Sequence, residues 1–220
     1  MRKLLKNTIS VVMLSIFWFL AWWLFKVRNK LTIVGKENLP SRTGILLYAN
    51  HQSLIDSMLV AFALFSFSDI LFHFRRIPWN AAAWENFFKQ TSRRIFCYFL
   101  KIIPAYRNSD MVSANNAVKE YAHILEYSNL LLFFEGTRSR DGIIGKCRYG
   151  PAKLITDHHP VAIPIKIEGM EKVMPIDIGF KWLKIKGGNH IVIKIGKEVD
   201  FNELGLEDIR FRVRDSVVNL

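Results

Sequence analysis

The sequence predicts an α/β fold: a single domain with a mostly parallel or mixed central sheet flanked by helices, preceded by one hydrophobic helix. The chain has 220 residues, 50% of them hydrophobic, which suffices for one substantial core. Beyond residue 30, short β-type runs alternate with longer helical segments, as expected for a sheet whose strands are joined by helices. The preceding segment is nearly all apolar. We therefore divide the chain into an N-terminal hydrophobic helix, residues 1–30, and an α/β domain, residues 31–220.

Residues 1–30 are expected to anchor the chain in a membrane. No charge occurs from Asn7 to Phe25, and about 20 apolar residues cross a bilayer core as a helix. A secretory signal is the alternative, but the apolar run is long, aromatic and followed by basic residues instead of a small-residue cleavage site. Because the basic residues balance across the run, the sequence leaves open whether the helix spans the membrane or lies in one leaflet. They are Arg2, Lys3 and Lys6 before the run and Lys26, Arg28 and Lys30 after it.

The α/β domain is predicted to contain seven strands and five helices. The strands are expected at residues 31–34, 45–49, 70–74, 102–106, 130–134, 161–167 and 191–195. The helices are expected at residues 54–65, 81–100 and 111–127, in a short segment after Pro151, and at residues 207–218. Ligands of such sheets bind beyond the carboxyl ends of the strands, so the loops after Ala49, Tyr106 and Phe134 are where a site is expected.

Charge and cysteine content restrict the partners and the compartment. The chain has 31 Lys and Arg against 19 Asp and Glu, a net charge of +12, so anionic lipid headgroups, an acidic carrier protein or nucleic acid are the candidate partners. Nucleic acid is not expected, because the basic residues are scattered and no nucleic-acid-binding motif is present. Cys97 and Cys147 lie far apart with no histidine at ligand spacing. We therefore expect a reducing, cytosolic environment and no metal site.

The loop after residues 45–49 reads NHQSLIDSMLV and contains His51 and Asp56. On one continuous helix this spacing corresponds to about 140° of rotation, so the two side chains meet only if His51 precedes the helix. Ser53 is a suitable N-cap for a helix that starts in between. Ser53 and Asp56 also form a pattern like a capping box, so a purely structural interpretation of Asp56 is equally good for this segment alone.

The functional interpretation of this pair is a general base with its orienting carboxylate. Asp56 would accept a hydrogen bond from one imidazole nitrogen of His51 and leave the other nitrogen to take a proton from an alcohol. This arrangement resembles a hydrolytic triad that lacks the enzyme nucleophile. No Gly-x-Ser-x-Gly motif supplies a serine, so a substrate hydroxyl is expected to attack directly.

The loop after residues 130–134 reads EGTRSRDG and has the composition of a phosphate site. Glycine lets the backbone approach a ligand, Thr137 donates a hydroxyl, and arginines such as Arg138 grip phosphate oxygens bidentately. A solvated turn is the alternative, since Asp141 and Gly142 are typical of turns. At the end of the fourth predicted strand, Arg107 is positioned to add another cation to the same crevice.

Four segments together carry a family resemblance. NHQSLID, IIPAYR, FFEGTR and PVAIP occur in the order and roughly the spacing of the four blocks of the glycerolipid acyltransferase family. The best likeness is to 1-acylglycerol-3-phosphate acyltransferases, over about residues 31–195. The resemblance implies an α/β acyltransferase domain and an N-terminal membrane motif. It also implies acyl-CoA or acyl-carrier protein as the donor, with no bound cofactor.

The resemblance also implies roles for individual residues. His51 matches the catalytic base and Asp56 its partner, and Arg107 matches the arginine of the second block. The glycerol-phosphate grip of the family matches Glu135, Gly136, Thr137 and Arg138. The implied reaction is transfer of a fatty acyl group to the free hydroxyl of a lysophospholipid, with 1-acylglycerol-3-phosphate giving phosphatidic acid as the first candidate. The implied location is a membrane, with the active site on the cytoplasmic face of the inner or plasma membrane.

This chain departs from the family pattern at three positions. Lys101 and Tyr106 stand where the second block usually has a glycine and an acidic or amide residue, and Phe134 replaces a proline before the glutamate. These blocks contact the headgroup side, so another lysolipid acceptor, such as a lyso-ornithine lipid, stays an alternative. A non-catalytic lipid-binding or lipid-transfer protein is the second alternative, but it gives no reason for the His51 and Asp56 pair.

Overall fold

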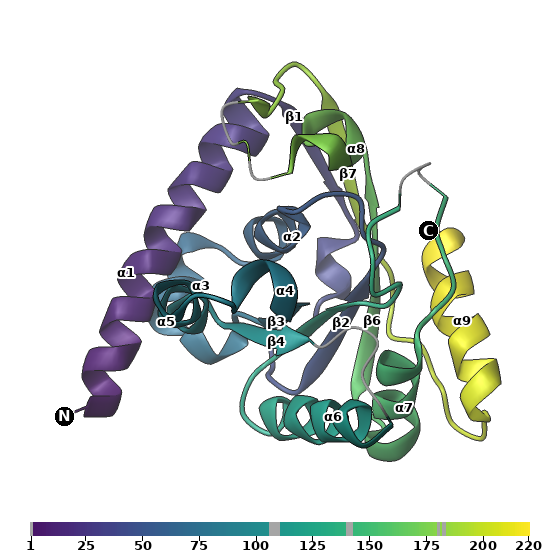
Figure 1. Cartoon of the computed structure of the whole chain (residues 1–220). Coiled ribbons are helices and arrows are strands. Elements are labelled where there is room, and N and C mark those ends of the chain that lie inside the picture. Colours follow the sequence, from purple (N-terminus) through teal and green to yellow (C-terminus); the bar gives the residue numbers. More distant parts are fainter. Residues whose placement is uncertain (1, 106–110, 140–142, 180, 182–183) are drawn as a thin grey trace.

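The computed structural model describes residues 2–105, 111–139, 143–179, 181 and 184–220, and Figure 1 shows a mixed sheet between two layers of helices. The sheet has seven strands in the order β1-β7-β6-β2-β5-β3-β4. All neighbours are parallel except β6 and β7, which are antiparallel. The strands are β1 (Lys30–Val34), β2 (Ile45–Ala49), β3 (Trp79–Ala83), β4 (Ile102–Ala105), β5 (Leu130–Phe133), β6 (Val161–Glu168) and β7 (His190–Ile195).

Two helical layers cover the two faces of the sheet (Figure 1). The first layer contains α1 to α5, and the second contains α6, α7 and α9. Short 3₁₀ helices occur at Lys36–Asn38, Phe74–Arg76 and Ile176–Ile178. The helices are α1 (Arg2–Trp22, continued by a π-helix at Trp23–Val27), α2 (Asp56–Leu64), α3 (Phe67–Phe72), α4 (Trp84–Phe87), α5 (Thr91–Phe99), α6 (Met111–Leu125), α7 (Tyr149–His158), α8 (Met170–Val173) and α9 (Leu206–Val218).

Strand β2 lies in the middle of the sheet, and all five of its residues are buried. Its side chains alternate between the two faces, as the pleat of a strand requires. Ile45, Leu47 and Ala49 join the hydrophobic core under the first layer, whereas Leu46 and Tyr48 join the core under the second. A strand covered on both faces carries a continuous apolar run, which is why residues 45–49 could be assigned from the sequence. The predicted fold class is confirmed.

Helix α1 packs on α2, α3 and α5. Its inward side supplies Ala21 to the first core, and the following π-helix supplies Phe25, which is fully buried. The indole Nε1 of Trp18 donates to the backbone oxygen of Phe65 at 3.2 Å. The opposite side of the helix is apolar and exposed, with Val12 and Ile16 among its side chains. In the described part of the chain, the stretch Asn7–Val27 is the one helix long and apolar enough to cross a membrane.

Two predicted elements were wrong. Residues 70–74 do not form a strand, because Ser66 starts the helix α3 with a capping box. The Ser66 hydroxyl accepts from Asp69 N at 3.2 Å, and the Asp69 carboxylate accepts from Ser66 N at 2.9 Å. Residues 81–100 do not form one helix, because the alanine-rich start of the segment, β3, pairs with β4 and β5. Sheet pairing there overrides the helical propensity of alanine.

Candidate active site

A cavity of about 570 Å³ lies beside the loops that follow β2 and β5. The two strands are parallel neighbours, so the residues that follow them emerge at the same edge of the sheet. His51 lines the cavity from the β2 loop, and Gly136, Thr137 and Arg138 line it from the β5 loop. The structure therefore brings these four predicted site residues together at one cavity.

The imidazole of His51 is hydrogen-bonded to the carboxylate of Asp56. His51 Nδ1 lies 2.9 Å from Asp56 Oδ2, and the Asp56 side chain is 0% exposed. The same oxygen accepts from the backbone amides of Gln52 at 2.6 Å and Ser53 at 2.8 Å. The other oxygen accepts from the Ser53 hydroxyl at 2.5 Å. Since a carboxylate so fully engaged acts only as an acceptor, Nδ1 of His51 is the donor in this hydrogen bond, and Nε2 is the ring nitrogen that does not contact Asp56.

The start of α2 differs from the prediction in one detail. Asp56 is the first residue of the helix, Ile55 is its N-cap, and no side chain caps it. The prediction of Ser53 as the N-cap was therefore wrong: its hydroxyl accepts from Ile55 N at 3.3 Å inside the loop. The carboxylate of Asp56 binds both the backbone before the helix and the imidazole, so the structural and orienting interpretations both apply to it.

Two further contacts fix the position of His51. Its ring stacks on the ring of Phe133, with centroids 4.1 Å apart and an angle of 14° between the planes. Its backbone amide donates to Glu135 Oε1 at 2.8 Å. The ring of His51 is thus held at its edge by the Asp56 carboxylate and on its face by Phe133, and its backbone is held by the Glu135 carboxylate. Such preorganisation suits a residue that acts as a general base.

Glu135 connects two loops behind the cavity. It is 5% exposed, and it is not among the described residues that line the cavity. Its second carboxylate oxygen accepts from Gly145 N at 2.7 Å. Burial raises the pKa of Glu135, and the hydrogen bonds from the Gly145 and His51 amides offset part of this rise. Because backbone amides engage both oxygens, these contacts support a positioning role for Glu135; its predicted contact with the acceptor stays a prediction.

Gly136 makes the turn that returns the chain to the cavity. Its φ of 65° lies in the left-handed region, where glycine is favoured. A Cβ at this position would lie 3.0 Å from Cγ of Arg148, so any other residue would also have to displace that side chain. Thr137 and Arg138 follow the turn and line the cavity.

Arg148 is a cavity residue that the sequence reasoning missed. Its Nε donates to the backbone oxygen of Glu135 at 3.2 Å, and the side chain lines the same cavity as Arg138. Nothing in the sequence separates it from the other scattered basic residues, because proximity to Gly136 arises only in the folded loop. Arg107, the remaining predicted cation, lies outside the described residues.

A second cavity of about 400 Å³ adjoins the first and is mostly apolar. Its walls come from α1 through Phe17 and Trp18, from α2 through Met58, and from α5 through Phe96 and Cys97. The two cavities share four lining residues, which are Leu54, Ser57, Asn80 and Phe87. Since its walls combine α1 with elements far away in the sequence, the cavity was not predicted.

The departures at Lys101 and Phe134 have structural explanations. Lys101 has a φ of 56°, a conformation that suits the glycine usual in the family. Its buried ammonium donates to the backbone oxygens of Phe74 and Ile77 and, at 3.0 Å, to the hydroxyl of Ser128. Phe134 is fully buried, and its backbone amide donates to the oxygen of Ala49 at 3.2 Å, a hydrogen bond that proline would lack. Neither residue lines the described part of the cavity near His51.

The site combines a base, cations and an apolar chamber. His51, Arg138 and Arg148 line the same cavity, and the apolar cavity shares four lining residues with it. Such an arrangement can hold a phosphorylated alcohol, remove its proton and seat a hydrocarbon chain close to the reacting atoms.

Comparison with known proteins identifies a matching family model, a similar curated protein and a similar crystal structure. Residues 30–168 match the family model described as Acyltransferase. A chloroplastic 1-acyl-sn-glycerol-3-phosphate acyltransferase of Arabidopsis thaliana is 28% identical over 152 residues, which are 66% of this chain and 38% of that protein. The chain thus spans less than half the length of that curated relative. The crystal structure of the 1-acyl-sn-glycerophosphate (LPA) acyltransferase PlsC of Thermotoga maritima superposes with a TM-score of 0.66 and 18% identity, covering 100% of this chain and 83% of the other.

Proposed function

Because the chain belongs to the acyltransferase family, whose model covers residues 30–168, we propose that it transfers a fatty acyl group from a carrier thioester to the free hydroxyl of a lysophospholipid. The first candidate acceptor is 1-acylglycerol-3-phosphate, giving phosphatidic acid in phospholipid biosynthesis. The observation that carries this proposal is the hydrogen-bonded pair of His51 and Asp56 at a cavity that also contains Arg138.

In the proposed reaction, Nε2 of His51 takes the proton of the acceptor hydroxyl as its oxygen attacks the thioester carbonyl carbon. The Nδ1 hydrogen bond to Asp56 stabilises the imidazolium that forms. When the tetrahedral intermediate collapses, the carbon–sulfur bond breaks and the imidazolium returns the proton to the departing thiolate. The reaction as proposed requires no metal and no cofactor beyond the acyl donor. The protein supplies mainly positioning and charge stabilisation, since the thioester already carries the driving force.

The acceptor and the donor are assigned to different parts of the site. Arg138, with Arg148 at the same cavity, is assigned to the acceptor phosphate, since guanidinium groups bind phosphate bidentately. Both relatives described above carry names that specify acylglycerol phosphate as the acceptor. The donor is proposed to be acyl-CoA or an acidic acyl-carrier protein, either of which suits a chain with a net charge of +12.

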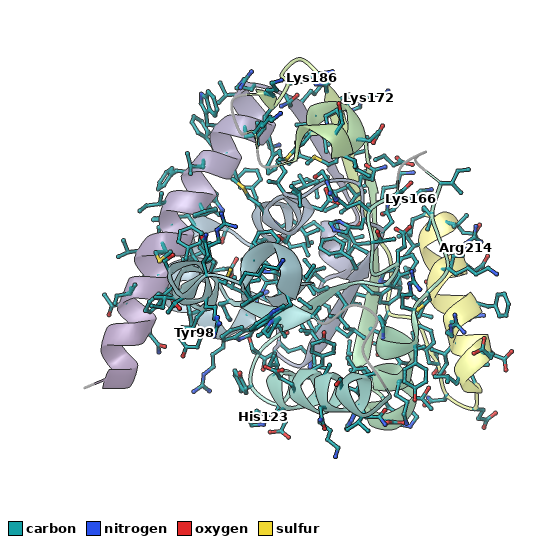
Figure 2. The ribbon with its side chains drawn as sticks, in the orientation of Figure 1. Tyr98, His123, Lys166, Lys172, Lys186 and Arg214 are labelled. Atoms are coloured by element: carbon teal, nitrogen blue, oxygen red, sulfur yellow. The ribbon has the colours of Figure 1, made fainter. Side chains whose placement is uncertain are left out.

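We also propose that the protein works at a phospholipid membrane, with the active site on its cytoplasmic face. The exposed apolar side of α1 continues onto α5, where Ile95 and Tyr98 are exposed and Phe96 contacts Phe17 of α1. Figure 2 shows Tyr98 at the surface on this side. Arg93 and Arg94 are exposed on the same helix, which has no acidic residue. An apolar surface with basic neighbours suits an anionic bilayer.

The experiment that tests the proposal incubates the purified full chain in phospholipid vesicles with a labelled acyl thioester and a panel of lysolipids. The panel contains 1-acylglycerol-3-phosphate, a lyso-ornithine lipid and other lysolipids without phosphate. We expect an acylated product from 1-acylglycerol-3-phosphate, and none with His51→Ala. Transfer to a different lysolipid instead would show that this lysolipid, and not 1-acylglycerol-3-phosphate, is the acceptor. Binding of lysolipids without any product, with either acyl-CoA or acyl-carrier protein as the labelled thioester, would contradict the enzymatic function.

A further inference from the structure

The polar and apolar cavities meet at a neck formed by the four residues that line both. Leu54 and Phe87 give the neck its apolar parts, and Ser57 and Asn80 give it the hydroxyl and the amide. His51 lines only the polar cavity, and the neck joins that cavity to the apolar one. The inference below rests on the proposed acyl transfer.

The neck is the place where the acyl carbonyl must react. The hydrocarbon chain of the donor fits the apolar cavity, whereas the acceptor hydroxyl must lie within hydrogen-bond reach of His51. The carbonyl carbon joins these two parts, so it lies between the apolar chamber and the base. The carbonyl oxygen gains a full negative charge when the hydroxyl attacks, and that charge needs preorganised hydrogen-bond donors.

We propose that the Ser57 hydroxyl, together with the Asn80 side-chain amide, donates hydrogen bonds to the acyl carbonyl oxygen as it becomes an oxyanion. In this step the acceptor oxygen forms a bond to the carbonyl carbon, the π electrons move to the carbonyl oxygen, and the proton moves to His51 Nε2. On collapse the electrons re-form the carbonyl, the carbon–sulfur bond breaks and the proton goes to the thiolate. Ser57 and Asn80 carry no charge and exchange no proton in either step.

Both side chains are held by rigid elements. Ser57 follows Asp56 in the first turn of α2, whose start is fixed by the hydrogen bonds to the Asp56 carboxylate. Among the described residues, none forms a hydrogen bond with the Ser57 hydroxyl, which leaves that hydroxyl for a ligand. Asn80 lies in β3, paired with β4 on one side and β5 on the other. Its Nδ2 reaches the backbone oxygen of Lys101 at only 3.5 Å, and this nitrogen carries a second hydrogen.

The test compares Ser57→Ala, Asn80→Ala and the double variant with the wild-type chain in the vesicle assay. Loss of one oxyanion donor is expected to lower kcat by about 10- to 100-fold, somewhat less than the roughly 10²- to 10³-fold known for strong donors. The KM values for donor and acceptor are expected to stay within about twofold, because the interaction strengthens only in the transition state. Ser57→Thr keeps the hydroxyl and should retain most of the activity. Ser92→Ala, at an exposed serine in the first turn of α5, is the matched control.

The pH profile separates this role from an indirect one through the neighbouring Asp56. An oxyanion donor leaves the shape of the kcat/KM profile unchanged, whereas a residue that acts through Asp56 and His51 would displace its acidic limb. A wild-type kcat in Ser57→Ala, a raised donor KM with normal kcat, or a displaced acidic limb would each overturn the inference. These results leave the proposed function intact, which fails only if the wild-type chain transfers no acyl group.

Discussion

The imidazole ring of His51 lies parallel to the phenyl ring of Phe133, the last residue of β5. The strand that leads into the loop of Gly136, Thr137 and Arg138 therefore also supports His51. Stacked aromatic pairs contribute about 0.5–1.5 kcal/mol beyond their burial, so Phe133→Ala should lower kcat up to about tenfold through loss of imidazole order. Phe133→Tyr preserves the stacking and should retain activity. Steady-state kinetics of both variants measure the effect, and an unimpaired Phe133→Ala would remove the stacking from the mechanism.

His51 and Asp56 should act as one unit in catalysis. We expect His51→Ala and Asp56→Ala each to lower kcat by at least about 10³-fold, with no further loss in the double variant, since an orienting carboxylate contributes nothing without its base. The two differ in stability, because Asp56→Ala strands the buried amides of Gln52 and Ser53, at about 1–3 kcal/mol each. Activity and melting curves of the three variants test this. Additive losses of activity would indicate independent roles.

Arg138 should discriminate between the two substrates. A charge-assisted hydrogen bond to phosphate contributes about 1.5–3 kcal/mol, so Arg138→Ala should raise the KM of a phosphate-bearing acceptor about tenfold or more and change the donor KM little. Arg138→Lys should rescue only part of the loss, because an ammonium lacks the planar fork. Arg212→Ala, at an exposed arginine of α9, is the control. An equal loss for both substrates with a lowered melting temperature would show that Arg138 supports the loop instead.

Lys101 should give the stability of the fold a characteristic pH dependence. Burial lowers the pKa of Lys101 from its usual 10.5 to about 7. Below pH 7 both folded and unfolded chains hold the proton. Between pH 7 and 10.5 Lys101 is protonated to a larger fraction in the unfolded chain than in the folded chain. The Lys101 contribution to the free energy of unfolding therefore rises with pH, by at most about 1.4 kcal/mol per pH unit.

The variant Lys101→Met lacks this titration. From pH 7 to pH 10 the free energy of unfolding of the wild type should therefore rise relative to that of the variant. Denaturant unfolding at several pH values in detergent measures it. Parallel curves for the two proteins would mean that the Lys101 ammonium is solvated in the folded chain.

The side of the molecule around α1 should contact lipid through the domain as well. Phe72 of α3 is 77% exposed next to α1, whereas Phe211 of α9 is 69% exposed behind the opposite face of the sheet (Figure 1). Burial of a phenyl group in lipid is worth roughly 1.5–3 kcal/mol, so Phe72→Ser should weaken binding to anionic vesicles by about 10- to 100-fold. Phe211→Ser should leave it unchanged. Flotation at limiting lipid measures both partition coefficients, and equal behaviour of the two variants would contradict the contact.

The sequence was most informative where one strong local pattern decided the structure. Residues 45–49 are apolar throughout because β2 is covered on both faces. The loop after them could be proposed as part of the site because ligands of such sheets bind beyond the carboxyl ends of the strands. Local sequence patterns predicted the wrong secondary structure in two segments, one of which is determined by strand pairing. The alanines of β3 favour a helix in isolation, but their pairing with β4 makes them part of a strand. Residues 70–74 look like a strand only if the capping by Ser66 is overlooked.

For the site, the sequence identified the residues with distinctive chemistry but not those defined by spatial arrangement. His51 and Asp56 stand out because an imidazole and a carboxylate flank a predicted helix start. Arg148 is one basic residue among 31, and only the folded loop places it against Gly136. Ser57 has no local signature either, since its significance comes from two cavities whose walls are assembled from distant segments.

The participation of α1 in the apolar cavity limits how this protein can be made water-soluble. Removing residues 1–28 would eliminate the wall that Phe17 and Trp18 provide and would expose the side chains that pack on it. Polar substitutions on the outward side of the helix, at Val12, Ile16 and Leu20, would instead leave that wall in place. A soluble form for crystallisation or ligand screening is therefore better obtained by resurfacing the helix than by cutting it off.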